Sequence, residues 1–213
     1  MRLTLIGMSG TGKSQWSARL EEAGFTHYSC DRRIAAALES ELGGGGDHMF
    51  QLGEWLGFPF EAGYDEREAV YLAHEHDVVA ELVDLLEHAP EATTGNVVID
   101  TTGSVVYLEP ALLERLRRCT TIVYLSVPHE HHAQLCRHYI ENPRPVLWRD
   151  AFLLRSGESR DEALARCYPA LLASRQRLYE ELADITITTD ERSIPGFAPE
   201  DLLALIRAKS GER

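Results

Sequence analysis

Short runs of almost continuous apolar residues recur along the chain, each followed by a polar or glycine-containing segment. Runs without a polar face are typical of strands that are buried on both sides, as in a parallel sheet. We therefore expect strands over residues 3–6, 96–100, 121–125 and 185–188, with a weaker fifth candidate over 25–28.

Segments with helical periodicity alternate with these strands. The longest, over residues 65–87, keeps an apolar stripe at helical spacing, and Pro110 is placed to open another helix. We expect helices over 14–23, 65–87, 110–118, 161–183 and 199–209, and we allow for a break near Pro169. Strands and helices in alternation, without a change in composition, predict an α/β fold with a parallel sheet and one domain over residues 1–213.

Composition limits the kinds of protein this can be. The chain has 213 residues, of which 44% are hydrophobic and 26% charged, as in ordinary globular domains. Its net charge of −13 argues against nucleic acid and against anionic membranes as partners, because both require clustered Lys and Arg. The first apolar run is too short for a signal peptide or a membrane span, and the four cysteines form no C-x-x-C pair. We expect a cytoplasmic protein with reduced thiols.

The negative charge is concentrated in one third of the chain. Residues 31–100 contain 16 acids and three arginines, whereas the rest of the chain has 18 acids and 18 bases. Any partner bound mainly by this third is expected to be neutral or cationic. A solvated acidic face explains the same charge equally well.

The first predicted strand leads into Gly7-Met-Ser-Gly-Thr-Gly-Lys-Ser14, which matches G-x-x-x-x-G-K-S and precedes a predicted helix. In this motif the glycines let successive N–H groups converge on phosphate oxygens, and the helix N-terminus adds partial positive charge. Lys13 is expected to reach the β- and γ-phosphates and Ser14 to bind Mg²⁺. The residue after Ser14 is Gln15 and not a threonine, so the set of loop residues expected to bind the nucleotide ends at Ser14. The residues expected to bind the nucleotide here are Gly7, Ser9, Gly10, Thr11, Gly12, Lys13 and Ser14.

Two aspartates follow predicted strands, where ligands gather in parallel sheets. Asp31 is a candidate to orient or deprotonate the group that accepts the phosphoryl, and its alternative role is a helix N-cap. Asp100 is a candidate metal ligand, directly or through water, and its alternative role is a strand-end turn residue.

Arginines are frequent between residues 137 and 160, around Asn142-Pro143-Arg144-Pro145. We interpret residues 141–160 as a lid that brings positive charge to the γ-phosphate, with Arg144 as the catalytic cation. We expect three of the five arginines in this segment to be ordinary surface residues: the set is Arg137, Arg144, Arg149, Arg155 and Arg160.

The phosphate loop, Asp31, the segment Val98-Ile-Asp-Thr-Thr-Gly-Ser-Val-Val106 and Arg144-Pro-Val-Leu147 together resemble the shikimate kinase family of P-loop kinases. The resemblance implies a three-layer P-loop NTPase fold with five parallel strands in the order 2-3-1-4-5. It also implies that Asp31 binds the acceptor hydroxyl as its base and that Gly103 helps to form the acceptor pocket. The remaining implied roles are adenine stacking by Arg137, adenine-loop contacts by Arg192 and binding of the substrate carboxylate by Arg175.

The acceptor half departs from the family pattern. An acid that the family associates with the metal, two residues before Asp31, is Ser29, and the family's glycine triplet reads Thr102-Gly103-Ser104. The substrate-binding arginine of the family's Phe-Arg-x-x-Glu pattern falls on Asp65, unless Arg67 replaces it after a shift of two residues. Insertions lie within an acceptor-binding region over about 31–90 and after Arg149.

The sequence therefore predicts an ATP- and Mg²⁺-dependent kinase that phosphorylates a hydroxyl of a small metabolite and has an altered acceptor site. The altered pattern favours a neutral or amine-bearing acceptor over a dianionic one. A nucleotide or gluconate-type kinase and a non-catalytic ATP/ADP-binding switch are the alternatives.

Overall fold

The computed structural model describes residues 1–42, 47–88, 95–141 and 144–211. Its five strands form one parallel sheet in the order β2-β3-β1-β4-β5, so the predicted strands, their direction and their order are confirmed. The strands are β1 (Arg2–Ile6), β2 (Thr26–Ser29), β3 (Val97–Asp100), β4 (Thr121–Leu125) and β5 (Ile185–Ile187).

Residues of β1, β3 and β4 enter two separate hydrophobic layers, which is why these strands are largely apolar. On β3, for example, Val98 packs in the layer that contains Trp16 and Leu202, whereas Val97 and Ile99 pack in the opposite layer. The smaller layer is covered by α1 (Lys13–Glu22) and α10 (Pro199–Ser210). The larger one is covered by α2 (Cys30–Ala37), α4 (Tyr64–His88), α6 (Pro110–Cys119) and α8 (Arg160–Leu182). The fold thus has the three layers of a P-loop kinase.

The helices expected from periodicity correspond to α1, α4, α6, α8 and α10, with ends that differ by at most one residue. The break near Pro169 was wrong, because α8 is a single helix from Arg160 to Leu182. A buried face that includes Leu164, Tyr168 and Leu172 holds α8 against the core through the proline. Elements without a clear sequence signal are α2, α3 (His48–Leu56), α7 (His132–Glu141), α9 (Thr189–Arg192) and the short 3₁₀ turns η1 (Val105–Tyr107), η2 (His129–His131) and η3 (Arg149–Ala151).

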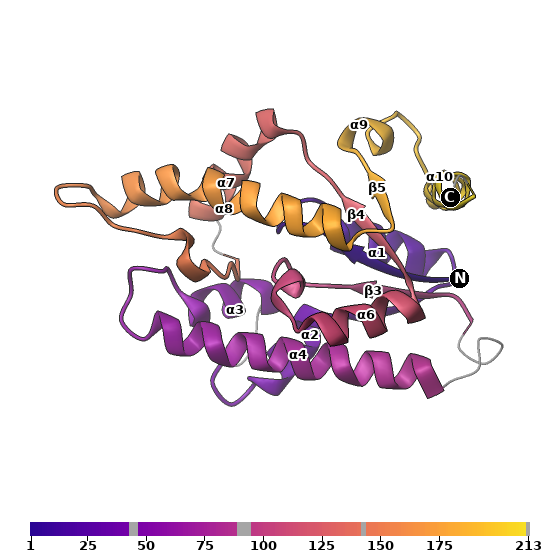
Figure 1. Cartoon of the computed structure of the whole chain (residues 1–213), viewed down its shortest axis with the longest axis horizontal. Helices are drawn as coiled ribbons and strands as arrows, with labels where there is room; N and C mark the ends of the chain where they lie inside the picture. Colours follow the sequence, from indigo (N-terminus) through magenta and orange to yellow (C-terminus); the bar gives the residue numbers. More distant parts are fainter. Residues whose placement is uncertain (43–46, 89–94, 142–143, 212–213) are drawn as a thin grey trace.

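The expected acceptor-binding region consists of α2, α3 and α4, which lie together along the lower side of Figure 1, with α7 and α8 along the upper side. The described residues do not include 43–46 and 89–90 of this region, or 142–143 of the expected lid. Aromatic side chains join the two parts: Phe58 stacks on Phe60 and packs edge-on against Tyr139, and Tyr139 contacts Trp148. These rings extend the main hydrophobic layer over the junction between α3 and α7.

No helix in the described parts of the chain is long and apolar enough to cross a bilayer.

Candidate active site

The phosphate loop follows β1 and leads into α1. Gly7, Gly10 and Gly12 have φ angles of 143°, 84° and 91°, which residues with a side chain rarely adopt. A Cβ on Gly7 would also lie 3.0 Å from the carbonyl oxygen of Leu125. The glycines of the motif are therefore needed for the turn itself, which places the loop at the N-terminus of α1, where anions are stabilised.

Lys13 is the first residue of α1 and its side chain folds back over the loop. Its Nζ donates hydrogen bonds to the carbonyl oxygens of Gly7 at 2.8 Å and Met8 at 3.0 Å. Burial lowers the pKa of Lys13, and the negative charges of Asp100 and Asp31 oppose that shift. The ammonium group therefore lies inside the loop, between the phosphate-binding backbone and the two aspartates.

One cavity lies on the outer side of the loop and has a volume of about 560 Å³. Gly10, Thr11 and Gly12 line it together with Arg137 from α7 and Arg192 from α9. Arg192 is held by hydrogen bonds from its guanidinium to the carbonyl oxygens of Ile187 and Thr11. The structure thus brings the two arginines expected at the nucleotide base next to the phosphate loop.

A second cavity, of about 310 Å³, lies on the other side of the loop and brings together the residues expected to react. Arg144 lines this cavity, and its Nη1 is 3.2 Å from Oδ2 of Asp47, the N-cap of α3. Gln15 lines both this cavity and the outer one. It is the residue after Ser14, with which the expected phosphate-binding set ends. The second cavity is lined by Lys13, Asp31, Gly103 and Arg144, with Ser9, Gly10, Gly12, Ser14 and other residues.

Asp31 does not cap a helix. Ser29 caps α2, because its hydroxyl accepts the N–H of Arg32, and Asp31 lies in the first turn with its side chain buried. The hydroxyl of Tyr71 on α4 donates to Oδ1 of Asp31 at 2.9 Å. Burial and the nearby charge of Asp100 raise the pKa of Asp31 to about 6, against the opposing effects of Lys13, Tyr71 and Arg144. A carboxylate in this setting can accept a proton near neutral pH.

Ser14, Asp31 and Asp100 line one further cavity of about 270 Å³. Asp100 is 1% exposed, and its Oδ1 accepts no hydrogen bond from the residues that the structure describes. Its Oδ2 faces His27 Nε2 across 3.8 Å. A buried carboxylate oxygen with free lone pairs, next to a serine hydroxyl at the start of α1, fits a bound Mg²⁺. In the register of the sheet Asp100 is paired with Ser29, the position where the family has an acid.

Sequence reasoning missed Glu75, which lies one helical turn after Tyr71 on the same face of α4. Its side chain is fully buried, and it accepts hydrogen bonds from the hydroxyls of Thr102 and Ser104. These are the two residues that replace glycines of the family's triplet. Burial raises the pKa of Glu75 to about 7, although the two hydroxyls oppose the shift. Glutamate on a predicted helix is usually exposed, so the pattern of α4 gives no sign that Glu75 is buried. The only signal in the sequence is the pair of hydroxyl residues, Thr102 and Ser104, which could have indicated a buried polar partner.

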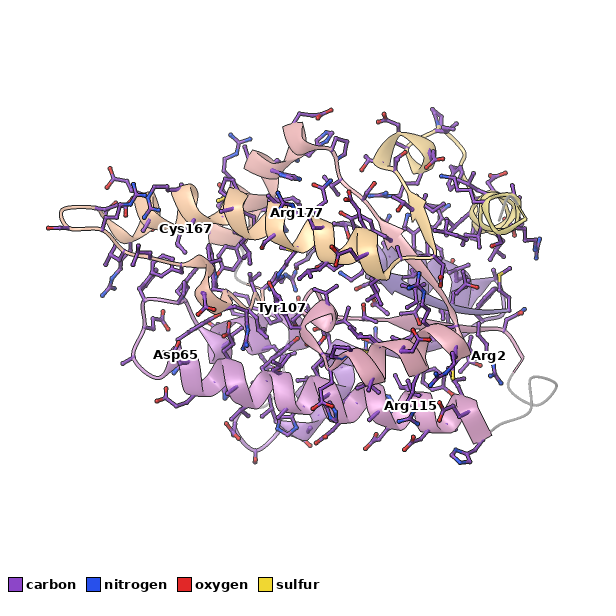
Figure 2. The ribbon with its side chains drawn as sticks, viewed as in Figure 1. Arg2, Asp65, Tyr107, Arg115, Cys167 and Arg177 are labelled. Carbon is purple, nitrogen blue, oxygen red and sulfur yellow. The ribbon has the colours of Figure 1, made fainter. Side chains whose placement is uncertain are left out.

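The residues considered for binding a substrate carboxylate lie in different parts of the structure. Arg175 is 1% exposed and lies behind Gly103, where it donates to the hydroxyl of Tyr107, to the sulfur of Met8 and to the carbonyl oxygen of Leu147. It does not line the cavity of Asp31. Asp65 is exposed at the start of α4, as Figure 2 shows, and Arg67 donates to the carbonyl oxygens of Leu56 and Ala62 away from the cavity. The structure therefore does not bring Arg67 to the cavity of Asp31.

The parallel sheet, the phosphate loop at the end of β1 and the carboxylates at the ends of β2 and β3 define a P-loop small-molecule kinase, which transfers a phosphoryl group to a hydroxyl. The sequence profile "Shikimate kinase" matches residues 64–205 of this chain. The chain belongs to the shikimate kinase family, whose members use ATP with Mg²⁺, and the predicted family, enzyme class and cofactors are confirmed.

Individual relatives agree with this assignment. The chain is 30% identical over 197 residues to the shikimate kinase of Thiobacillus denitrificans, covering 92% of this chain and 85% of the relative. It is 29% identical over 210 residues to the shikimate kinase of Nitrosococcus oceani, covering 97% and 88%. Its fold is similar to that of the shikimate kinase from Acinetobacter baumannii in complex with shikimate, with a TM-score of 0.61, 23% identity and coverage of 97% and 93%. The shikimate kinase from Bacteroides thetaiotaomicron gives a TM-score of 0.60 at 19% identity, with coverage of 98% and 97%. These matches favour neither the nucleotide or gluconate-type kinase nor the non-catalytic switch.

Proposed function

We propose that this kinase transfers the γ-phosphoryl of ATP to a hydroxyl of a small metabolite through Lys13, Asp31 and Arg144, at an acceptor site altered from the family pattern. The observation that carries the proposal is that these three side chains line one cavity beside the phosphate loop. Shikimate is the first acceptor to test, because the similar curated proteins are shikimate kinases.

Each residue has a distinct role in this proposal. The loop amides from Ser9 to Ser14 and the ammonium of Lys13 bind the phosphates, and Arg137 and Arg192 contact the nucleotide base. Asp31, held by Tyr71, orients the acceptor hydroxyl and takes its proton. Arg144 supplies positive charge to the phosphoryl group in transfer. Gly103 and Arg175 help to shape the acceptor pocket.

In the transfer, the acceptor oxygen forms a bond to the γ-phosphorus while the bond from that phosphorus to the oxygen of ADP breaks. The acceptor proton moves to a carboxylate oxygen of Asp31. Ser14 and Asp100 would hold Mg²⁺, which when bound neutralises phosphate charge. The raised pKa of Asp31, about 6, still lies below neutral pH, so its carboxylate is mostly ionised there and can accept the proton.

Replacing Lys13 by Met tests the proposal. Lys13 is 7% exposed and Met preserves the apolar stem, so we expect the fold to remain while acceptor-dependent ADP release falls by at least about 10³-fold. The measurement is ADP production with shikimate, gluconate, nucleosides and amino-alcohols as acceptors, with circular dichroism as the control for folding. Near-normal turnover by Lys13→Met would rule out this mechanism. If the wild-type protein binds ATP but no acceptor stimulates ADP release, the protein is a nucleotide-binding switch instead.

A further inference from the structure

A single buried carboxylate on α4 holds the loop that follows β3. Glu75 is fully buried, and Thr102 and Ser104 are 3% and 2% exposed. The hydroxyl of Thr102 contacts Oε1 of Glu75, and that of Ser104 lies 2.5 Å from Oε2. Gly103, between these two residues in sequence, lines the cavity of Asp31. The position of Gly103 therefore depends on the contacts of Glu75.

The same loop is also held by neighbouring elements. It lies between α4 and α8 in Figure 1, and the hydroxyl of Tyr179 on α8 donates to the carbonyl oxygen of Gly103. The hydroxyl of Thr101 donates to the carbonyl oxygen of Leu5 at 2.8 Å. A Cβ on Gly103 would lie 3.4 Å from the backbone nitrogen of Ser9 in the phosphate loop. A shift of Gly103 would therefore change the shape of the cavity next to the phosphate loop.

The carboxyl of Glu75 and the two hydroxyls form a closed ring of three contacts. The third contact joins the hydroxyl oxygens of Thr102 and Ser104, which are 2.9 Å apart. Each contact needs one proton, and the two hydroxyls supply only two. When Glu75 is ionised, both hydroxyls donate to it, and no proton is left between their oxygens. The backbone N–H of Ser104 does not take this place, because it makes a separate bond to Oγ1 of Thr102 at 3.1 Å.

A proton on Glu75 completes the ring. Its Oε2–H then donates to the hydroxyl of Ser104, Ser104 donates to Thr102, and Thr102 donates to Oε1. Hydrogen bonds linked in this way strengthen one another in buried surroundings. Burial also favours the neutral carboxyl over the charged one. The ring is therefore complete only when Glu75 is protonated.

The surroundings of Glu75 make both forms accessible near neutral pH. Burial and the negative charge of Asp31 raise its pKa to about 7, although the two hydroxyls and Arg175 oppose this shift. Among the described residues, the titratable and charged groups that face Glu75 are Lys13 on α1, Cys30 and Asp31 on α2, Tyr71 on α4, and Arg175 and Tyr179 on α8. The ring should therefore close below about pH 7 and open above it.

We propose that Glu75 is a positioning residue for the acceptor: its protonated carboxyl closes the ring with Thr102 and Ser104 and holds Gly103 at the cavity of Asp31. Loss of the proton removes one hydrogen bond and loosens the loop, so the acceptor binds more weakly. Nucleotide binding is unaffected, because the cavity of Arg137 and Arg192 does not include the residues of the ring. Since the hydroxyls replace two glycines of the family's triplet, the ring is a feature of this chain. This inference rests on the proposed kinase function.

The experiment measures KM for the acceptor and for ATP between about pH 6 and about pH 8.5 in wild type, Glu75→Gln and Glu75→Ala. The acceptor is shikimate, or another of the compounds tested if shikimate is not phosphorylated. Glutamine matches the protonated form, because its amide nitrogen donates to Ser104 while its oxygen accepts the hydroxyl of Thr102. In wild type we expect the acceptor KM to rise about 3- to 10-fold over this range, in keeping with the loss of one hydrogen bond. It should stay low at every pH in Glu75→Gln and high at every pH in Glu75→Ala, with KM for ATP unchanged.

Asp31 is present in all three proteins, so its own titration cancels in the comparison. Glu81→Gln is the matched control, because it removes a carboxylate of the same helix whose side chain is 70% exposed, and it should keep the wild-type profile. An acceptor KM that varies with pH in Glu75→Gln as it does in wild type would overturn the inference. So would a Gln variant whose acceptor KM is as high as that of Glu75→Ala.

Infrared spectroscopy tests the ring without relying on turnover or on the folding of Glu75→Ala. The C=O band of a protonated carboxyl should be stronger in wild type than in Glu75→Gln below pH 7, and this difference should disappear as the pH rises. Absence of the difference would refute the protonated ring. An active wild type whose acceptor KM does not change with pH would refute the inference alone. A wild type that releases no ADP with any acceptor would refute the kinase function, and the positioning role with it.

Discussion

At the scale of single residues, the acceptor side of the site is built around two buried carboxylates. Asp31 on α2 and Glu75 on α4 are both enclosed, and Tyr71 connects them because it donates to Asp31 from the turn before Glu75. Their surroundings differ: Asp31 lines the cavity, whereas both oxygens of Glu75 accept hydroxyls from the loop after β3. In the proposed mechanism Asp31 therefore reacts, whereas Glu75 positions the loop that carries Gly103.

Asp31→Asn is expected to lower kcat by about 10²- to 10⁴-fold, because the amide cannot accept the proton of the acceptor. The variant should fold normally, since Ser29 caps α2 and the amide oxygen can still accept the hydroxyl of Tyr71. Steady-state kinetics and thermal unfolding measure the two effects. Loss of the fold together with activity would mean that Asp31 is mainly structural.

The stability of the apoprotein should depend on pH through Glu75. Burial raises its pKa from 4.5 to about 7, so the folded state binds the proton more tightly than the unfolded chain. This contribution to stability is complete below about pH 4.5 and is lost as the pH rises through about 7. Because Gln does not titrate, Glu75→Gln should be less sensitive to pH than wild type, by on the order of 1–3 kcal/mol between about pH 5 and pH 8. Urea unfolding at both pH values measures the difference, and parallel curves for the two proteins would contradict it.

At the scale of elements, α8 contains a proline in its interior, a position where proline usually destabilises a helix. Pro169 is exposed within the helix, which continues through it. Replacing it by Ala restores a backbone donor and removes a steric clash, but it also makes the unfolded chain more flexible. We expect Pro169→Ala to stabilise the protein by about 1–2 kcal/mol in denaturant unfolding.

Ala173→Pro is the control for Pro169→Ala, because Ala173 is an exposed position one turn further along α8. It should destabilise the protein by about 3 kcal/mol, the usual cost of proline inside a helix. If Pro169→Ala instead destabilised the protein, the proline would have a packing role that its exposure does not indicate.

The elements that could be predicted from the sequence are those in which each face keeps the same environment along the whole element, because their hydrophobic pattern is then regular. The strands β1, β3 and β4 are covered on both faces, and α4 and α10 have one buried stripe, so their patterns are uniform. The helix α3 could not be predicted, because its two aromatic residues lie in different environments: Phe50 is exposed, whereas Trp55 packs against the larger hydrophobic layer. Pro169 does not break α8, because tertiary packing overrides the low helix propensity of proline.

At the scale of the whole molecule, the sequence located the nucleotide half of the site because a contiguous motif fixes it. Lys13 and Ser14 are neighbours in sequence, Asp100 ends β3 and Asp31 follows the adjacent strand β2, so the topology brings them together. Glu75 and Arg149 could not be located in this way. Their positions depend on where α4 and the segment after Arg144 pack, and no local pattern records the contacts of Glu68 with Arg149 or of Glu75 with Ser104.

The net charge of −13 should make stability depend on salt. The exposed acids on the outer face of α4 repel one another, and Arg115 offsets part of this through ion pairs with Asp84 and Glu87. Exposed pairs contribute little and are screened by the same salt that relieves the repulsion. We expect repulsion to dominate, so the midpoint of thermal unfolding should rise by a few degrees between about 20 mM and about 500 mM NaCl.

Arg115→Gln provides the internal test of this balance, because it makes the protein more negative and breaks both ion pairs. The variant should be less stable than wild type at low salt and should gain more from added NaCl, so that the two unfolding midpoints converge at high salt. Differential scanning calorimetry over the same salt range measures both. A midpoint that falls with salt in wild type, and less steeply in Arg115→Gln, would show that attractive ion pairs outweigh the repulsion along α4. The acidic third would then stabilise the fold rather than strain it.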